Sequence, residues 1–134
     1  MNRSEIMAAV KSKDTHPEKV VRRMLFALGY RYRLHAKNLP GCPDIVFPSR
    51  RKAIFVHGCF WHGHRCRAGR NRPASNTEYW NRKLTGNVNR DRHNIKILKK
   101  AGWSIHVIWE CETRDSARMS SQLAAFLRKS AATR

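Results

Sequence analysis

The chain has 134 residues, with 28 Lys and Arg against 9 Asp and Glu, a formal net charge of +19 and a sequence pI near 11.1. This length fits one domain, residues 1–134, with a modest core, and it excludes a second catalytic module. The basic residues run from Arg3 to Arg134, so we expect a folded basic surface whose partner is a polyanion. A ribosomal or histone-like protein would show the same charge balance, which therefore defines only a class of partner.

The N-terminal residues Met1–Glu5 do not open an apolar stretch of signal-peptide length, and no apolar run is long enough to cross a bilayer. We therefore expect a cytoplasmic protein. In that reducing compartment, cysteines serve more often as metal ligands or buried thiols than as disulfides. This applies to Cys42, Cys59, Cys66 and Cys111.

The first half of the chain predicts one helix and a run of strands. Pro17 in a first turn, apolar residues at helical spacing and Gly29 as a stop predict a helix. Alternating residues over Tyr30–Leu34 predict a half-buried strand, and Asp44–Phe47 and Lys52–His57 predict buried strands. The last two are joined by a short connection, so we expect an antiparallel hairpin.

The second half begins with an irregular segment, residues 58–74, which is rich in Gly, Cys, His and Arg and lacks periodicity. Helical patterns follow over 76–84 and 88–101, then a strand over 103–110 and a helix over 117–128. An N-terminal arm of about residues 1–14 and a frayed tail of about residues 129–134 complete the chain. The pattern predicts an α/β fold with a mixed central sheet between helices.

The spacing Cys59-x4-His64-x-Cys66, together with Cys111 after the last strand, is typical of a structural zinc site. Three thiolates and one imidazole form a common closed tetrahedral ligand set, which would join the irregular segment to a strand end. The alternative is two buried free cysteines and an unrelated pair.

Asp44 follows a proline and opens an apolar strand, and the next strand ends at His57. A carboxylate in that position is typical of restriction-like nucleases, where it holds Mg²⁺ against the scissile phosphate. The alternative is a turn in which Asp44 caps the backbone. Glu18, His62 and Asp91 are further candidates whose proximity the spacing does not show.

Phe60 and Trp61 lie in a polar segment beside the predicted zinc ligands. Aromatic side chains on a basic surface can wedge between base pairs. Core packing is the alternative. The pair Tyr79-Trp80 poses the same choice.

Over about residues 3–112 the chain resembles the very short patch repair endonucleases, which nick DNA beside T·G mismatches left by deamination of 5-methylcytosine. The resemblance rests on these motifs: Arg3-Ser4-x-x-Met7, Thr15-x-x-Glu18, Leu39-Pro-Gly-x-Pro-Asp44, Phe55-Val-His-Gly-Cys-Phe-Trp-His62, Asn87-Val-x-Arg-Asp91-Arg and Ile108-Trp-Glu-Cys111.

The resemblance implies a restriction-endonuclease-like fold in which Asp44 and the main-chain carbonyl of Val56 hold Mg²⁺, in a site of two-metal type. A threonine can stand at the Val56 position in the family, and a main-chain ligand tolerates that change. By the same resemblance, Glu18 would orient a water on the metal. His57 and His62 would contact the phosphate or handle protons, with Asp91 supporting a histidine.

The resemblance also implies a second metal and a DNA interface. Zinc would be held by the four residues named from the spacing, leaving Cys42 an ordinary thiol. Phe60, Trp61 and Trp80 would enter the major groove and wedge open the stack, with Met7 reaching the other face.

The expected partner is double-stranded DNA with a T·G mismatch, bound by a monomer in a bacterial cytoplasm and at the nucleoid during repair. Mismatch-repair helper proteins are further candidate partners. Two other functions stay open: a related nickase or restriction enzyme without mismatch specificity, and a non-catalytic, zinc-containing DNA-binding module.

Overall fold

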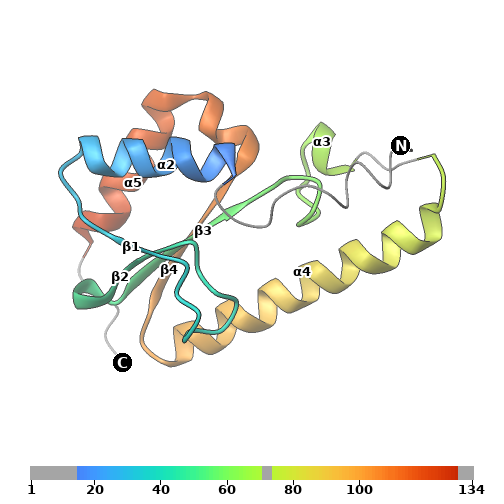
Figure 1. Cartoon of the computed structure of the whole chain (residues 1–134), viewed down its shortest axis with the longest axis horizontal. Helices are drawn as coiled ribbons and strands as arrows, with labels where there is room; N and C mark the ends of the chain where they lie inside the picture. The colour runs from blue at the N-terminus through green and yellow to red at the C-terminus, as the bar shows by residue number, and fades with distance from the viewer. Residues whose placement is uncertain (1–14, 71–73, 130–134) are drawn as a thin grey trace.

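The computed structural model describes residues 15–70 and 74–129 (Figure 1). The predicted N-terminal arm, including Met7, and the predicted tail from residue 130 onward lie outside these ranges. The described helices and strands are arranged around one sheet.

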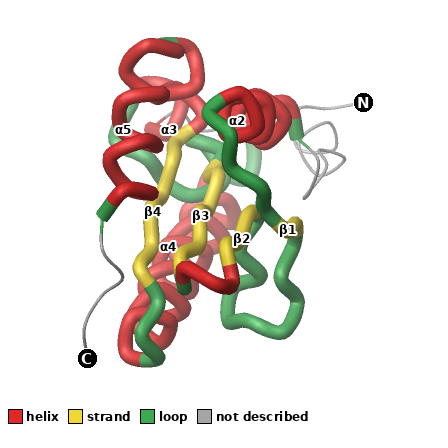
Figure 2. Tube along the Cα trace, turned by 90° about the vertical axis from the view of Figure 1, so that its left-hand side faces the viewer, coloured by secondary structure: helices red, strands yellow, loops and turns green. Residues whose placement is uncertain are grey.

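The sheet has four strands in the order β1-β2-β3-β4: Arg33–Leu34, Ile45–Phe47, Lys52–His57 and Ser104–Trp109. β1 pairs with β2, and β2 with β3, in antiparallel fashion, whereas β3 and β4 are parallel. Figure 2 shows the four strands side by side in this order. A parallel pair requires a long crossover connection, which the chain between β3 and β4 supplies. The predicted mixed sheet and the predicted β2–β3 hairpin are thus confirmed.

Helices cover both faces of the sheet, as expected (Figure 1). α2 (His16–Ala27) and α5 (Ser116–Arg128) lie on one face, and α4 (Thr77–Lys100) lies on the other. The main core forms between the sheet and the α2–α5 layer. It contains Val21, Leu25, Ile45, Phe47, Ile54, Val56, Ile108, Met119, Leu123 and Leu127.

α2 begins and ends where its sequence signals predict. The Thr15 side chain accepts a hydrogen bond from the backbone N–H of Glu18 at 3.4 Å, and a proline occupies the first turn. Gly29 follows the helix with φ +92°, a left-handed conformation that glycine adopts without a steric penalty. Glu18 is thereby fixed on the first turn of a helix that packs on the sheet.

Three details of the predicted secondary structure were wrong. The two helices predicted over 76–84 and 88–101 form the single helix α4, because Thr85-Gly86-Asn87 has weak helix propensity but lacks a proline to break the hydrogen-bond ladder. The strand predicted over Tyr30–Leu34 pairs only at Arg33–Leu34, since its partner β2 is only three residues long. The segment predicted to be irregular contains one helical turn, α3 (Arg67–Arg70).

Lys52 is a buried cation at the start of β3, 2% exposed. Its Nζ donates to the carbonyl oxygens of Phe126 at 2.6 Å, Leu127 at 3.1 Å and Lys129 at 2.5 Å. These are carbonyls at the C-terminus of α5, where a positive charge also complements the helix dipole. Burial first, and then the charges of Arg50 and Lys129, lower the pKa of the Lys52 ammonium.

Two short 3-10 helices complete the described elements: η1 (Pro48–Arg50) in the β2–β3 hairpin and η2 (Glu110–Arg114) after β4. At η2, the Glu112 carboxylate accepts a hydrogen bond from the backbone N–H of Trp109 at 2.8 Å. Within the described part of the chain, every helix is too short or too polar to cross a membrane.

Candidate active site and metal centre

The four predicted zinc ligands lie together at the ends of the two parallel strands. His57 of β3 pairs with Trp109 of β4, and Cys59 and Cys111 each follow two residues later. His64 and Cys66 return from the adjoining loop, so that one ligand atom from each of the four residues lies within 4.8 Å of the others. The parallel register therefore brings together cysteines that are far apart in sequence.

The spacing within this cluster suits a tetrahedral ion. The Cys111 Sγ and His64 Nδ1 are 3.6 Å apart. Bonds of about 2.3 Å to sulfur and about 2.0 Å to nitrogen place neighbouring tetrahedral ligands about 3.5 to 3.8 Å apart. The backbone N–H of Cys111 also donates to Cys59 Sγ at 3.4 Å. This donor set fits zinc, and it excludes none of the other soft or borderline divalent ions.

The thiols of the cluster differ in their ionisation. Burial raises the pKa of Cys59 to about 12 and also raises that of Cys111. Burial acts in the same direction on Cys66, but hydrogen bonds from the Gly69 backbone N–H and from His64, Cys59 and Cys111 outweigh it and lower the Cys66 pKa to about 6. Metal binding would need all three as thiolates and would therefore release protons.

Gly69 allows the ligand loop to fold this tightly. A Cβ at this position would lie 2.0 Å from the carbonyl oxygen of His64 and 2.9 Å from that of Cys59. Any side chain would therefore push α3 away from the cluster. Gly69 has no signal in the sequence, because the need for glycine arises from a contact between two turns.

A second group of metal-binding residue types lies beside the start of β2. It consists of Glu18, His35 and Asp44, whose ligand atoms lie within 4.8 Å of one another. The Asp44 Oδ2 accepts a hydrogen bond from the backbone N–H of Val56 at 2.7 Å. The carboxylate therefore reaches across to β3 instead of capping its own turn, which argues against the turn alternative.

This environment disfavours the charged form of Asp44. Burial, opposed by the Val56 hydrogen bond and reinforced by the nearby Glu18 carboxylate, raises the Asp44 pKa to about 7. Two carboxyl groups in one partly buried site repel each other when both are ionised. A bound cation would relieve that repulsion, which is the behaviour expected of a metal site.

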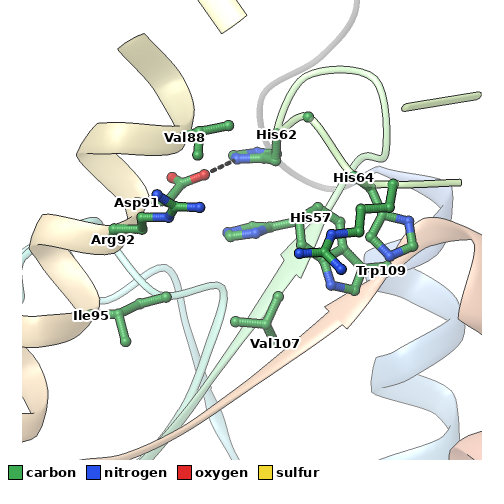
Figure 3. Close-up of a pocket in the computed structure, with 11 residues that line it drawn as sticks. His57, His62, His64, Val88, Asp91, Arg92, Ile95, Val107 and Trp109 are labelled. Carbon is green, nitrogen blue, oxygen red and sulfur yellow. Dashed lines mark hydrogen bonds and ion pairs between the residues drawn. The ribbon is translucent and has the colours of Figure 1, made fainter. Parts of the chain in front are cut away.

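A third group, on the other face of the sheet, consists of His57, His62 and Asp91. The His57 and His62 rings stack with their centroids 3.8 Å apart and their planes 6° apart. The Asp91 carboxylate lies 2.5 Å from His62 Nδ1 (Figure 3). Asp91 comes from α4 and His62 from the loop after β3, so this contact joins two layers.

These residues line a cavity of about 410 Å³ between α4 and the ends of β3 and β4 (Figure 3). Arg65 and Arg92 also line the cavity, so its walls combine two histidines and an acid with two cations. A pocket of this kind suits an anionic group such as a phosphate.

His57 is held in its neutral form. Burial first, and then the charge of His62, lower its pKa to about 4, with Asp91 acting in the opposite direction. Among the described residues its buried Nδ1 has no hydrogen-bond partner. An unpartnered buried ring nitrogen is costly, and a bound phosphate or water would satisfy it.

The predicted catalytic residues thus fall into two groups, one on each side of β3. Val56 belongs to the main core, whereas its neighbour His57 lines the α4 cavity, as alternation along a strand requires. The Asp44–Val56 hydrogen bond connects the two groups through the β3 backbone.

Phe60, Trp61 and Trp80 form an aromatic cluster beside the metal centre. Their rings meet edge to face, with centroids 5.2 to 5.6 Å apart. Trp80 is 2% exposed and lies beneath the partly exposed Phe60 and Trp61. The Trp80 ring therefore packs in the free protein, and its predicted contact with DNA stays a prediction, as do those of Phe60 and Trp61.

Sequence reasoning missed His35. Its Nε2 lies 3.1 Å from the Glu18 carboxylate, and the only local signal was a histidine preceding the Pro-Asp motif. Cys42, expected to be an ordinary thiol, is exposed and lies outside the described metal-binding groups.

Comparison with known proteins agrees with this geometry. The family described as "DNA mismatch endonuclease Vsr" matches residues 1–68. A type II nicking enzyme of Xanthomonas oryzae pv. oryzae, V.XorIIP, is 50% identical over 125 residues, which cover 93% of this chain and 91% of that protein. A second type II nicking enzyme, V.NmeAIP of Neisseria meningitidis, is 42% identical over 127 residues, 95% of this chain and 90% of its own.

The DNA mismatch endonuclease Vsr of Escherichia coli K12 is 39% identical over 120 residues, which cover 90% of this chain and 76% of that protein. These relatives confirm the resemblance seen in the motifs. They show an enzyme that cleaves DNA phosphodiester bonds, and they exclude the reading as a non-catalytic zinc module. A nuclease of this kind implies a divalent metal, and its partner is DNA. The chain belongs to the Vsr family of DNA mismatch endonucleases.

Proposed function

We propose that this protein nicks one strand of duplex DNA next to a T·G mismatch, by Mg²⁺-dependent hydrolysis, in the repair of deaminated 5-methylcytosine. The observation that carries this proposal is the placement of Asp44. Its carboxylate lies beside Glu18 and accepts a hydrogen bond from the backbone N–H of Val56 in β3. The next residue in β3 is the neutral His57. Similarity to the DNA mismatch endonuclease of Escherichia coli supports mismatch recognition.

Asp44 and the main-chain carbonyl of Val56 would hold Mg²⁺ in a two-metal type of site. Oxygen donors of this kind suit a hard cation, and the raised Asp44 pKa marks a carboxyl group that gains from a positive charge nearby. Bound Mg²⁺ supplies charge neutralisation at the phosphate and acidifies water. Glu18, fixed on the first turn of α2, orients the attacking water.

His57 and His62 contact the phosphate or move a proton in the α4 cavity. His57 is neutral at physiological pH, so it can accept a proton or a hydrogen bond. Asp91 holds His62 through Nδ1, and this leaves the Nε2 side of the ring for the substrate. Asp91 is therefore the residue that supports a histidine.

Zinc bound by Cys59, His64, Cys66 and Cys111 would be structural, because four protein ligands leave no position for substrate. The cluster borders both the α4 cavity, through His64, and the aromatic cluster, through Cys59. Phe60 and Trp61 wedge into the stacked bases with Trp80 beside them, and Met7 reaches the opposite face. A mispaired step costs less to open than a paired one.

This scheme corresponds to a restriction-endonuclease-like core in which one domain, acting as a monomer, carries the whole reaction in the bacterial cytoplasm and at the nucleoid. Mismatch-repair helper proteins would act on its turnover.

The test is cleavage of end-labelled duplexes by purified protein. A T·G duplex should be nicked on one strand in Mg²⁺ and left intact when Mg²⁺ is omitted, and a fully paired duplex of the same sequence should be cut far more slowly. Asp44→Asn protein, purified in parallel, controls for contaminating nuclease. Nicking of the T·G duplex by the Asp44→Asn protein at the wild-type rate would overturn the assigned site.

A second candidate function is nicking without mismatch specificity. The relatives at 50% and 42% identity carry names of type II nicking enzymes. The same assay separates the two, because equal rates on the paired and T·G duplexes would favour this reading.

A further inference from the structure

We propose that His35 is a positioning residue that fixes the Glu18 carboxylate beside Asp44. This inference rests on the proposed function, in which both acids serve the reaction. Nothing in the motifs or in the comparisons assigns a role to His35.

The side chain of His35 acts on Glu18 through one atom. His35 Nε2 lies 3.1 Å from Glu18 Oε2 and 3.4 Å from Arg22 Nη2, and the same Arg22 nitrogen lies 2.9 Å from Glu18 Oε2. A single Nε2 cannot both donate to the acid and accept from the guanidinium. Arg22 already donates to the carboxylate at the shorter distance, so the Nε2–H donates to Glu18.

The backbone of His35 acts on Asp44. The His35 N–H donates to the Asp44 carbonyl at 3.0 Å, and the next N–H, of Ala36, donates to the Pro43 carbonyl at 3.1 Å. His35 also has φ +49°, a left-handed conformation that turns the chain at this point. One residue therefore contacts both acidic residues: its ring contacts the Glu18 carboxylate, and its backbone contacts the main chain of Asp44.

Through His35, the Glu18 carboxylate on α2 is linked to the main chain that carries Asp44. Glu18 is 2% exposed at its side chain, and His35 is 18% exposed, so these contacts are made in a shielded site where a misplaced carboxylate finds few alternative partners. Residues that orient catalytic or metal-binding groups typically contribute about 10-fold to 100-fold to activity or metal affinity.

The test compares His35→Leu with His35→Gln. Both side chains pay a similar backbone penalty for positive φ, but only Gln places an N–H donor near the former Nε2. We expect His35→Leu to lose about 10-fold to 100-fold in kcat and to need more Mg²⁺ for half-maximal rate. Its binding to the T·G duplex without added Mg²⁺ should stay within about twofold of wild type. His35→Gln should recover most of the kcat.

Equal kcat in His35→Leu and wild type, while Asp44→Asn is inactive, would overturn this proposal and leave the proposed function standing. Active Asp44→Asn would instead refute the proposed function. Equal losses in the Leu and Gln variants, with zinc content and Tm unchanged, would also overturn the positioning role. If His35→Leu fails to fold, His35→Ser replaces it, since serine is too short to reach Glu18.

A different observation carries a second inference: we infer that the exposed basic face of the C-terminal half of α4 binds the DNA backbone. A groove of about 550 Å³ lies along this part of the helix, lined by Arg92, Ile95, Lys96, Lys99 and Lys100. Arg92 and Ile95 also line the His57–His62 cavity, so the groove is continuous with the candidate active site.

The charge and length of the groove suit binding to several successive phosphates of one DNA strand. Its four cations are exposed, and no acid within residues 15–70 and 74–129 forms an ion pair with them. At a rise of about 1.5 Å per residue, the helix from Arg92 to Lys99 is about 10 Å long. This length corresponds to about three base-pair steps along one strand. A duplex placed at the cavity would extend along this face.

The test is the salt dependence of binding to a matched duplex without added Mg²⁺, a measurement that does not depend on cleavage. Removal of each phosphate contact lowers the slope of log K against log salt by about 0.9. The triple variant K96Q/K99Q/K100Q should lose about 2 to 3 from the slope. The control R114Q/R118Q/R128Q removes three exposed cations near or on α5, in the opposite layer.

The control should keep a slope within about 0.5 of wild type. Equal slopes in both triple variants would overturn the inference, because charge would then act without regard to position. An unchanged slope in the lysine variant would identify the face as a solvated helix surface.

Discussion

Replacing Asp44 with Asn should stabilise the metal-free protein while abolishing nicking. Asn keeps the side-chain shape and an oxygen that can accept the hydrogen bond donated by Val56 at 2.7 Å. It removes the negative charge that burial and Glu18 disfavour. The folded protein therefore gains stability from the change, and catalysis loses the carboxylate proposed to hold Mg²⁺.

The size of the effect follows from the pKa of Asp44, about 7 in the folded protein against an ordinary value of 3.8. A raised folded-state pKa contributes stability below the unfolded value, and that stability is lost as pH rises through about 7. Three pKa units would correspond to about 4 kcal/mol. Partial exposure screens the charge, so we expect about 1–2 kcal/mol at pH 8.

The assay is urea denaturation of wild type and Asp44→Asn in the absence of Mg²⁺, at pH 4.5 and pH 8. The variant should be more stable at pH 8, and the difference should shrink toward zero at pH 4.5. Mg²⁺ should narrow the gap at pH 8, because it binds the folded wild type alone. A variant no more stable than wild type at pH 8, or a gap independent of pH, would refute the electrostatic reasoning.

The remaining predictions concern the metal centre, the charge, the wedge and an acid-sensitive histidine. Cys111→Ser, or chelation of the metal, should lower Tm substantially, whereas Cys42→Ser should shift it little; a folded, active preparation without zinc by elemental analysis would contradict this. Binding should weaken steeply with salt, with nearly the same slope for T·G and matched duplexes in a filter-binding or anisotropy titration, and a flat dependence would leave the +19 charge unexplained. Phe60→Ala or Trp61→Ala should reduce the ratio of the T·G cleavage rate to the matched cleavage rate more than it reduces affinity for matched DNA. An unchanged ratio would contradict insertion of these side chains between the bases. The pKa of His57 is lowered to about 4, so its contribution to stability is complete above about pH 6.5 and is lost as pH falls toward 4. In denaturation measurements between pH 7 and 4.5, the free energy of unfolding of wild type should fall by up to about 3 kcal/mol more than that of His57→Asn. Parallel pH dependences of the two proteins would contradict this.

The local parts of the fold were readable from the sequence. Periodicity and turn chemistry predicted α2, the β2–β3 hairpin and α5, because each depends on residues close together in the chain. The grouping of Cys59, His64 and Cys66 was readable for the same reason, since their spacing alone suits a tetrahedral ion. The motifs from the His57 segment to Cys111 identified the family.

Tertiary structure decided what depends on distant residues. Cys111 reaches Cys59 only because β3 and β4 pair in parallel with His57 opposite Trp109. Two predicted helices became α4, since packing and cooperative hydrogen bonding outweigh the weak propensity around Gly86.

The same limit applies to the candidate catalytic residues. Sequence motifs nominated Glu18 and Asp44, but they could not show that the two share a site or that His35 contacts both, because these contacts join α2, the turn before β2 and the end of β1. Side-chain chemistry is encoded residue by residue, whereas a pKa or a carboxylate position depends on which elements the fold brings together.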